Sequence, residues 1–108
     1  MAEQPTISTH VLDAATGLPA PGVVVTLIHL PDDPDALDEP TGGTTDDDGR
    51  IRSLTKGPLK TGSYLIVFRV AGPFFREVSI EFVVDDVTRS YHVPLLLAPY
   101  SLTSYRGS

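Results

Sequence analysis

The sequence predicts an all-β fold, a β-sandwich or barrel of about eight strands that occupies residues 1–108 as a single domain. Short apolar or alternating runs recur along the chain, separated by Gly, Pro and Asp clusters at intervals too short for helices. The composition, 41% hydrophobic and 20% charged over 108 residues, is ordinary for a folded globular protein. No segment approaches the roughly 18 apolar residues of a membrane span, so we expect no association with a membrane.

Two strands are predicted in the first third of the chain. Residues 6–12 alternate in character, which sets two groups on opposite faces of a strand: Ile7, Thr9 and Val11 on one, and Ser8, His10 and Leu12 on the other. Residues 23–30 are rich in β-branched side chains, which favour a well-buried strand, and Pro31 ends this run.

A loop and a tight turn are predicted next. Residues 31–43 are acidic and contain prolines, which is typical of a solvated loop that leads to Thr44-Thr45. The Asp46-Asp-Asp-Gly49 sequence then predicts a tight turn. This turn brings Arg50 to the start of a short strand.

The second half of the chain contains the remaining predicted strands. Residues 62–70 and 74–84 read as neighbouring antiparallel strands, and the second has four apolar side chains on one face: Val78, Ile80, Phe82 and Val84. Residues 89–97 and a tail strand over residues 101–105 complete the set.

The strand over residues 89–97 is expected to be irregular and to need a partner. Pro94 lacks the N–H that a central strand uses for its ladder of hydrogen bonds. The three leucines at positions 95–97 cannot all face one side of a strand. At least one of them points away from the core of its own subunit, and a second subunit is the simplest cover for it.

Charge and cysteine content exclude several classes of function. The formal net charge is -6, and the eight basic residues form no stripe that could neutralise phosphates, so we expect no nucleic-acid partner. The absence of cysteine excludes disulfides, thiolate metal sites and a cysteine nucleophile. The first residues lack a basic start followed by an apolar stretch, so we expect a cytoplasmic protein.

The candidate acid–base groups are three histidines, His10, His29 and His92, because only imidazole has an unperturbed pKa near neutrality. A histidine in a strand is more often structural than catalytic, and His29 is assigned to that structural class. Arg50, which follows a turn, could hold a planar anion with two parallel hydrogen bonds. No phosphate loop, nucleophile-elbow serine or metal-binding spacing is present in the sequence.

Four motifs spread over nearly the whole chain carry a resemblance to a known family: Ser8-Thr-His-Val-Leu-Asp13, Asp48-Gly-Arg-Ile51, Tyr91-His-Val-Pro-Leu-Leu-Leu97 and Tyr105-Arg-Gly-Ser108. They resemble the 5-hydroxyisourate hydrolases, the transthyretin-like enzymes. The resemblance implies an antiparallel transthyretin-like β-sandwich. It also implies a hydrolase of urate degradation, which opens the ring of 5-hydroxyisourate to give 2-oxo-4-hydroxy-4-carboxy-5-ureidoimidazoline.

The resemblance further implies which residues act. It assigns His10, Arg50 and His92 to the reacting centre, and it assigns four tail residues to the substrate pocket: Tyr105, Arg106, Gly107 and Ser108. The family assembles as a homotetramer, a dimer of dimers with sites between subunits. The implied reaction is attack of water on a ring amide carbonyl, in which the two histidines share proton transfer and Arg50 orients the substrate. Which histidine is the base stays open, and the reaction requires neither a metal nor an organic cofactor.

The chain also departs from the family pattern. Residues 70–73 run straight to Phe74-Phe-Arg-Glu77, so the short helix usual between the fifth and sixth strands is predicted to be missing. Leu102 stands where an aromatic residue is common, and Ala98 stands where a serine is. Two alternatives remain: a carrier of small aromatic ligands on the same tetramer, and a monomeric immunoglobulin-like structural module.

Overall fold

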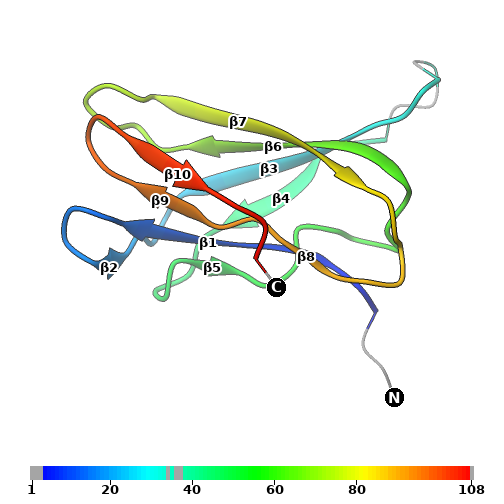
Figure 1. Ribbon diagram of the computed structural model, residues 1–108, viewed down its shortest axis with the longest axis horizontal. Helices are drawn as coiled ribbons and strands as arrows, with labels where there is room; N and C mark the ends of the chain where they lie inside the picture. Colours follow the sequence, from blue (N-terminus) through cyan, green and yellow to red (C-terminus); the bar gives the residue numbers. More distant parts are fainter. Residues whose placement is uncertain (1–3, 34, 36–37, 108) are drawn as a thin grey trace.

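Two β-sheets packed face to face make up the computed structural model, which describes residues 4–33, 35 and 38–107 (Figure 1). In one sheet the order is β10 (Leu102–Ser104), β9 (Leu95–Leu97), β1 (Ile7–Asp13) and β2 (Leu18–Pro19), and β1 also pairs with β5 (Arg50–Ile51) and β8 (Tyr91–His92). In the other the order is β4 (Thr41–Thr44), β3 (Val24–Leu30), β6 (Gly62–Arg69) and β7 (Glu77–Val84). The all-β prediction is confirmed, and the described residues contain no α-helix.

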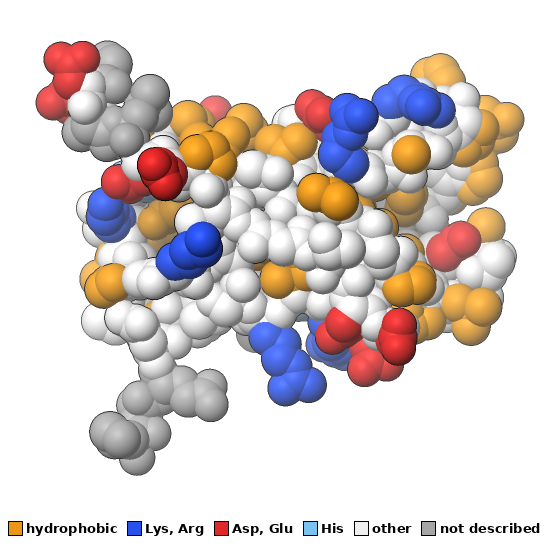
Figure 2. Space-filling model, turned by 180° about the vertical axis from the view of Figure 1, so that it is seen from behind, with side chains coloured by type: hydrophobic (Ala, Val, Ile, Leu, Met, Phe, Trp, Pro, Cys, Tyr) orange, Lys and Arg blue, Asp and Glu red, His pale blue; other side chains and the backbone are white. Residues whose placement is uncertain are grey.

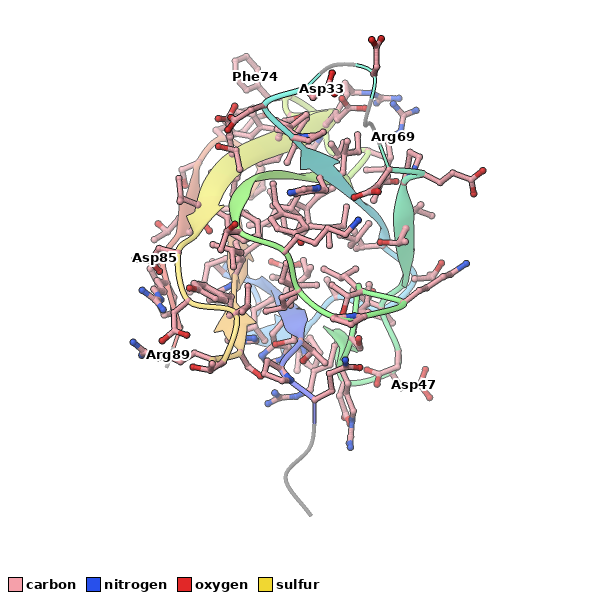
Figure 3. All side chains as sticks on the ribbon, turned by 90° about the vertical axis from the view of Figure 1, so that its right-hand side faces the viewer. Asp33, Asp47, Arg69, Phe74, Asp85 and Arg89 are labelled. Atoms are coloured by element: carbon pink, nitrogen blue, oxygen red, sulfur yellow. The ribbon has the colours of Figure 1, made fainter. Side chains whose placement is uncertain are left out.

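The core lies between the sheets, where side chains from both layers fill the space (Figure 3). The alternation in β1 behaves as predicted, since every second side chain is buried: Ile7, Thr9 and Val11. In β6 the buried set is Tyr64, Ile66 and Phe68. The opposite face of β1, which carries Ser8 and His10, therefore points away from the core.

The antiparallel pairing of β6 with β7 is confirmed, with Gly62 opposite Val84 and Arg69 opposite Glu77. The predicted apolar face of β7 is also correct, because Val78 and Val84 are buried and Val83 is exposed. The predicted start of that strand at Phe74 was wrong. Residues 70–76 form the connection, where the Val70 N–H donates to the Arg76 carbonyl oxygen at 3.2 Å.

The connection over residues 70–76 contains no helix, as the departure from the family pattern predicted. Its Phe74 ring lies beside Phe75 and near Tyr100 of the β9–β10 connection, with centroid separations of 5.0 and 6.2 Å. Figure 2 shows hydrophobic side chains gathered at this end of the sandwich, on the right of that view. Phe74 and Tyr100 are both largely exposed.

The strand pattern differs from the prediction in two further places. The acidic loop ends earlier, because β4 begins at Thr41, which pairs with Leu27 of β3. The sheet that contains β1 is mixed rather than purely antiparallel, since β8 and β9 run parallel to β1. The chain crosses from the other sheet after β7, so it enters this sheet in the same direction as β1.

The irregularity predicted at Pro94 is present, because Val93 and Pro94 separate β8 from β9. The predicted strand over residues 89–97 is therefore two short strands, and the described part of the chain forms ten strands instead of about eight. Leu95 is fully buried, whereas Leu96 is only partly buried. Leu96 pairs with Leu12 in the register of β1 and β9, so both side chains point to the outer face of the sheet.

Candidate active site

The strand register brings His10 and Arg50 together. His10 of β1 pairs directly with Arg50 of β5, so the two side chains leave the outer face of the sheet side by side. The predicted turn positions Arg50: the Gly49 N–H donates to the Asp46 carbonyl oxygen at 2.9 Å, and the Arg50 N–H donates to the Asp46 carboxylate at 3.0 Å. Gly49 has φ 76°, and a Cβ there would collide with the Val11 carbonyl oxygen.

The hydrogen bond of His10 determines which of its ring nitrogens is free. Its Nε2 lies 2.9 Å from the carbonyl oxygen of Asp48, which can only accept, so Nε2 carries the proton. The remaining lone pair of a neutral His10 is therefore on Nδ1. This contact also attaches β1 to the turn that precedes Arg50.

His92 lies on the same outer face, at the end of β8. Its register partner on β1 is Ser8, and the Ser8 Oγ lies 2.9 Å from the Nδ1 of His92. Ser8 and His10 are two positions apart on β1, about 7 Å at the usual strand rise. Burial, and then the nearby His10 and Arg50 side chains, lower the pKa of the His92 imidazole from its ordinary value of 6.5. The ring is therefore neutral at pH 7.

A hollow of about 460 Å³ opens beside these side chains. The residues that line it come from β1, β5, β8 and the segments next to them: Ser8, Thr9, Arg50, Ile51, Arg52, Ser90, Tyr91 and His92. His10 is outside this lining set, although it is the register partner of Arg50. The lining includes two guanidiniums, those of Arg50 and Arg52. Neither forms a hydrogen bond or ion pair with a residue that the structure describes, so both are available to a polar ligand.

The C-terminal tail returns to His92 from the other side. The Gly107 N–H donates to the His92 carbonyl oxygen at 2.8 Å, which forms an isolated β-bridge. Tyr105 is 57% exposed and, with Arg106 and His92, lines a second hollow of about 230 Å³. The guanidinium carbon of Arg106 lies 4.6 Å from the centre of the Tyr91 ring, a cation–π contact. Ser108, the last predicted pocket residue, lies outside the described residues.

The structure separates His29 from the other two histidines. His29 is on β3 in the opposite sheet, and its Nδ1 lies 2.9 Å from the Asp38 carboxylate, which Lys60 also binds. Its ring packs on Tyr64 at a centroid distance of 4.7 Å. These contacts fit the structural role predicted for His29.

Two residues near the site were missed by reasoning from the sequence. Ser8 carries the contact to His92, and Arg52 adds a second guanidinium to the lining of the larger hollow. Strand alternation offered a signal for both, because Ser8 shares the face of His10 and Arg52 lies two positions after Arg50.

Among the described residues, no three His, Asp or Glu side chains are grouped to hold a metal ion. Within the same part of the chain, no helix is long and apolar enough to cross a bilayer.

Comparison with known proteins identifies relatives that match over almost the full length of the chain. A 5-hydroxyisourate hydrolase of Deinococcus radiodurans is 38% identical over 121 aligned residues, and the alignment covers all of both chains. The solved structure of Klebsiella pneumoniae 5-hydroxyisourate hydrolase superposes with a TM-score of 0.79 at 32% identity, over 95% of this chain and 99% of that one.

The same fold also occurs in a binding protein. Sea bream transthyretin, solved in complex with thyroxine, superposes with a TM-score of 0.80 at 26% identity, over 94% of this chain and 93% of that one. The sequence profile of the HIUase/Transthyretin family matches residues 7–107. The antiparallel-rich sandwich, the profile and the full-length relatives agree, and the chain belongs to the HIUase/Transthyretin family.

Proposed function

We propose that this chain is a 5-hydroxyisourate hydrolase that opens the ring of its substrate without a cofactor. The observation that carries the proposal is the convergence of His10, Arg50 and His92, from three separate strands, on one face beside a hollow. The relatives with the higher identities, at 38% and 32%, are named as hydrolases, and the transthyretin match is at 26%. A carrier would not need two imidazoles and a guanidinium at this place.

The geometry favours His92 as the general base. Its Nδ1 is occupied by Ser8, which leaves Nε2 free, and its lowered pKa keeps the ring neutral at pH 7. In the proposed reaction, Nε2 of His92 removes a proton from water as the water oxygen bonds to the ring amide carbon. The ring C–N bond then breaks, and the leaving nitrogen takes up a proton from the imidazolium or from His10.

Arg50 is proposed to stabilise the negative charge that develops on the carbonyl oxygen. Its guanidinium is exposed and lies beside His10, so it can donate two hydrogen bonds to a planar polar ring. Removal of one such donor typically lowers kcat by about 100- to 1000-fold. We propose that Tyr105, Arg106, Gly107 and Ser108 border the substrate from the tail.

We further propose that residues 1–108 act as one domain and assemble as a homotetramer. Support comes from the outer face of the β1 sheet, where Leu12 and Leu96 form an apolar area next to His10. Light scattering should then report four times the 11.6 kDa of one chain. A monomer would contradict the tetramer and favour a structural module. A cytoplasmic location stays a prediction, which cell fractionation would test.

The test is a stopped-flow assay in which urate oxidase generates 5-hydroxyisourate and the decay of this labile compound is followed with and without the protein. We expect strong acceleration over buffer, a loss of about 100- to 10,000-fold in His92→Ala, and a large loss in Arg50→Ala. Both variants should keep the circular dichroism spectrum and mass of the parent.

Matched controls come from the opposite sheet. His29→Gln removes an imidazole bound to Asp38. Arg69→Ala removes a guanidinium paired with Glu77, and Arg69 is labelled in the upper part of Figure 3. Both should retain the parent rate. If the parent protein failed to accelerate the decay but bound thyroxine, the carrier alternative would replace the hydrolase.

A further inference from the structure

Ser8 contacts His92 in a way that the proposed reaction has not yet used. The two residues are 84 positions apart and meet because β1 and β8 pair in parallel, with Ser8 opposite His92. The Oγ–Nδ1 distance of 2.9 Å is that of a hydrogen bond. The Ser8 hydroxyl makes no other hydrogen bond to a residue that the structure describes, so the contact with His92 is its one described role.

A hydroxyl suits an imidazole that gains and loses a proton. Serine Oγ can both donate and accept, so it can bind Nδ1 in either neutral tautomer. When the free Nε2 serves as the base, Nδ1 carries the proton and donates a hydrogen bond to Oγ. After Nε2 is protonated, the same hydrogen bond becomes charge-assisted and stronger. The ring can therefore keep one orientation throughout the reaction.

We propose that Ser8 is the positioning residue of His92, holding the imidazole so that Nε2 faces the hollow. This inference rests on the proposed function. Ser8 acts through the imidazole and does not touch the reacting atoms. Its place corresponds to that of the third member of a catalytic triad, which holds the imidazole in the required tautomer.

The neutral character of Ser8 matters as much as its position. Burial, and then the nearby side chains of His10 on β1 and Arg50 on β5, disfavour the imidazolium of His92. Two further guanidiniums, those of Arg52 and Arg106, line the hollows on either side of it. A carboxylate at position 8 would oppose them and raise the pKa of His92. A base that was already protonated at pH 7 could not accept a proton from water, so a hydroxyl orients the ring without blocking it.

Three substitutions at position 8 separate positioning from a purely structural role. Ser8→Ala should lower kcat by about 10- to 100-fold and leave KM within about twofold, because misplacement by about 1 Å costs about 100-fold. Ser8→Thr, which keeps a hydroxyl, should restore most of the rate. Ser8→Asp should move the acidic limb of the kcat/KM profile to higher pH, which the loss of a structural contact would not do.

A second measurement tests the contact without any turnover. The ¹⁵N chemical shifts of the His92 ring report its tautomer, and Ser8→Ala should change the balance between the Nδ1–H and Nε2–H forms. If the parent protein proves inactive, the proposed function fails, yet this spectrum still tests whether Ser8 orients the ring. A Ser8→Ala variant with the parent rate and unchanged ring shifts would overturn the proposal.

Discussion

Gly107→Ala tests how closely the tail packs on the proposed base. A Cβ at Gly107 would lie 2.5 Å from Cδ2 of His92, 3.1 Å from its Cγ and 3.2 Å from its Cβ. Carbon atoms pack favourably at about 3.5–4.0 Å, so either the imidazole or the tail must move by about 1 Å. The tail is held there by the 2.8 Å hydrogen bond from the Gly107 N–H to the His92 carbonyl oxygen.

The size of the effect follows from that displacement. A shift of about 1 Å in a reacting group lowers the rate by about 100-fold, so kcat for 5-hydroxyisourate should fall by about that factor in Gly107→Ala. Loss of the tail hydrogen bond removes only about 1 kcal/mol of stability, so the melting temperature should change by a few degrees. Stopped-flow turnover and thermal unfolding, measured on the same preparation, give both numbers.

Gly57→Ala is the matched control, because a Cβ at Gly57 meets no atom within 4 Å. It makes the same chemical change in open space and should keep the parent kcat. A Gly107→Ala rate within about threefold of the parent, with Gly57→Ala also unchanged, would refute the close coupling of the tail to His92.

Three further predictions concern pH, packing and assembly. The pKa of His92 should lie below 6.5 in an NMR titration, so kcat/KM should persist as the pH falls through 6.5, and Arg50→Gln should raise that pKa because a neighbouring cation is removed. Phe68→Ala, at a fully buried position on β6, should lower the free energy of unfolding by about 3–5 kcal/mol in a urea titration. Leu96→Glu should leave the fold intact but lower the mass measured by light scattering, because Leu96 points outward from its own core. An unchanged mass would remove the outer face of β9 from the proposed subunit contact.

The period of two predicted the strand that became β1 and the apolar face of β7, and the β-branched run over residues 23–30 predicted β3. It grouped Ile7, Thr9 and Val11 on one face of β1, which the structure shows to be the buried face, and it assigned the apolar face of β7 correctly. It did not locate the start of β7, because Phe74 and Phe75 have high strand propensity, and yet they pack on each other and Phe74 packs near Tyr100 at the end of the sandwich. Tertiary contacts of this kind outweigh local strand propensity, and the alternation of apolar and polar residues does not reveal them.

The site shows where reasoning from residues alone stops. By residue type the three histidines are equal candidates, and residue type offered no contact to support the structural role assigned to His29. The structure places His29 in the other sheet, paired with Asp38, whereas His10 and His92 share an outer face. The resemblance to the hydrolases selected the same two from their motifs. The partner of His92 could not be predicted in this way, because the pairing of Ser8 with His92 depends on a parallel register between segments 84 residues apart.

The segment that joins β8 to β9 explains why the tail lies against the imidazole. The segment from β8 to β9 keeps one register along β1, and the Val93 N–H donates to the Ser8 carbonyl oxygen. His92 and Pro94 are two positions apart, so their carbonyl oxygens lie on the opposite edge, where both accept hydrogen bonds from the tail. The Ser104 hydroxyl donates to the Pro94 carbonyl oxygen at 2.8 Å, and the Gly107 N–H donates to that of His92 at the same distance. These two bonds bracket Tyr105 and Arg106 and hold them beside His92. The carbonyl oxygens of His92 and Pro94 thus hold the proposed substrate-binding residues beside the proposed base.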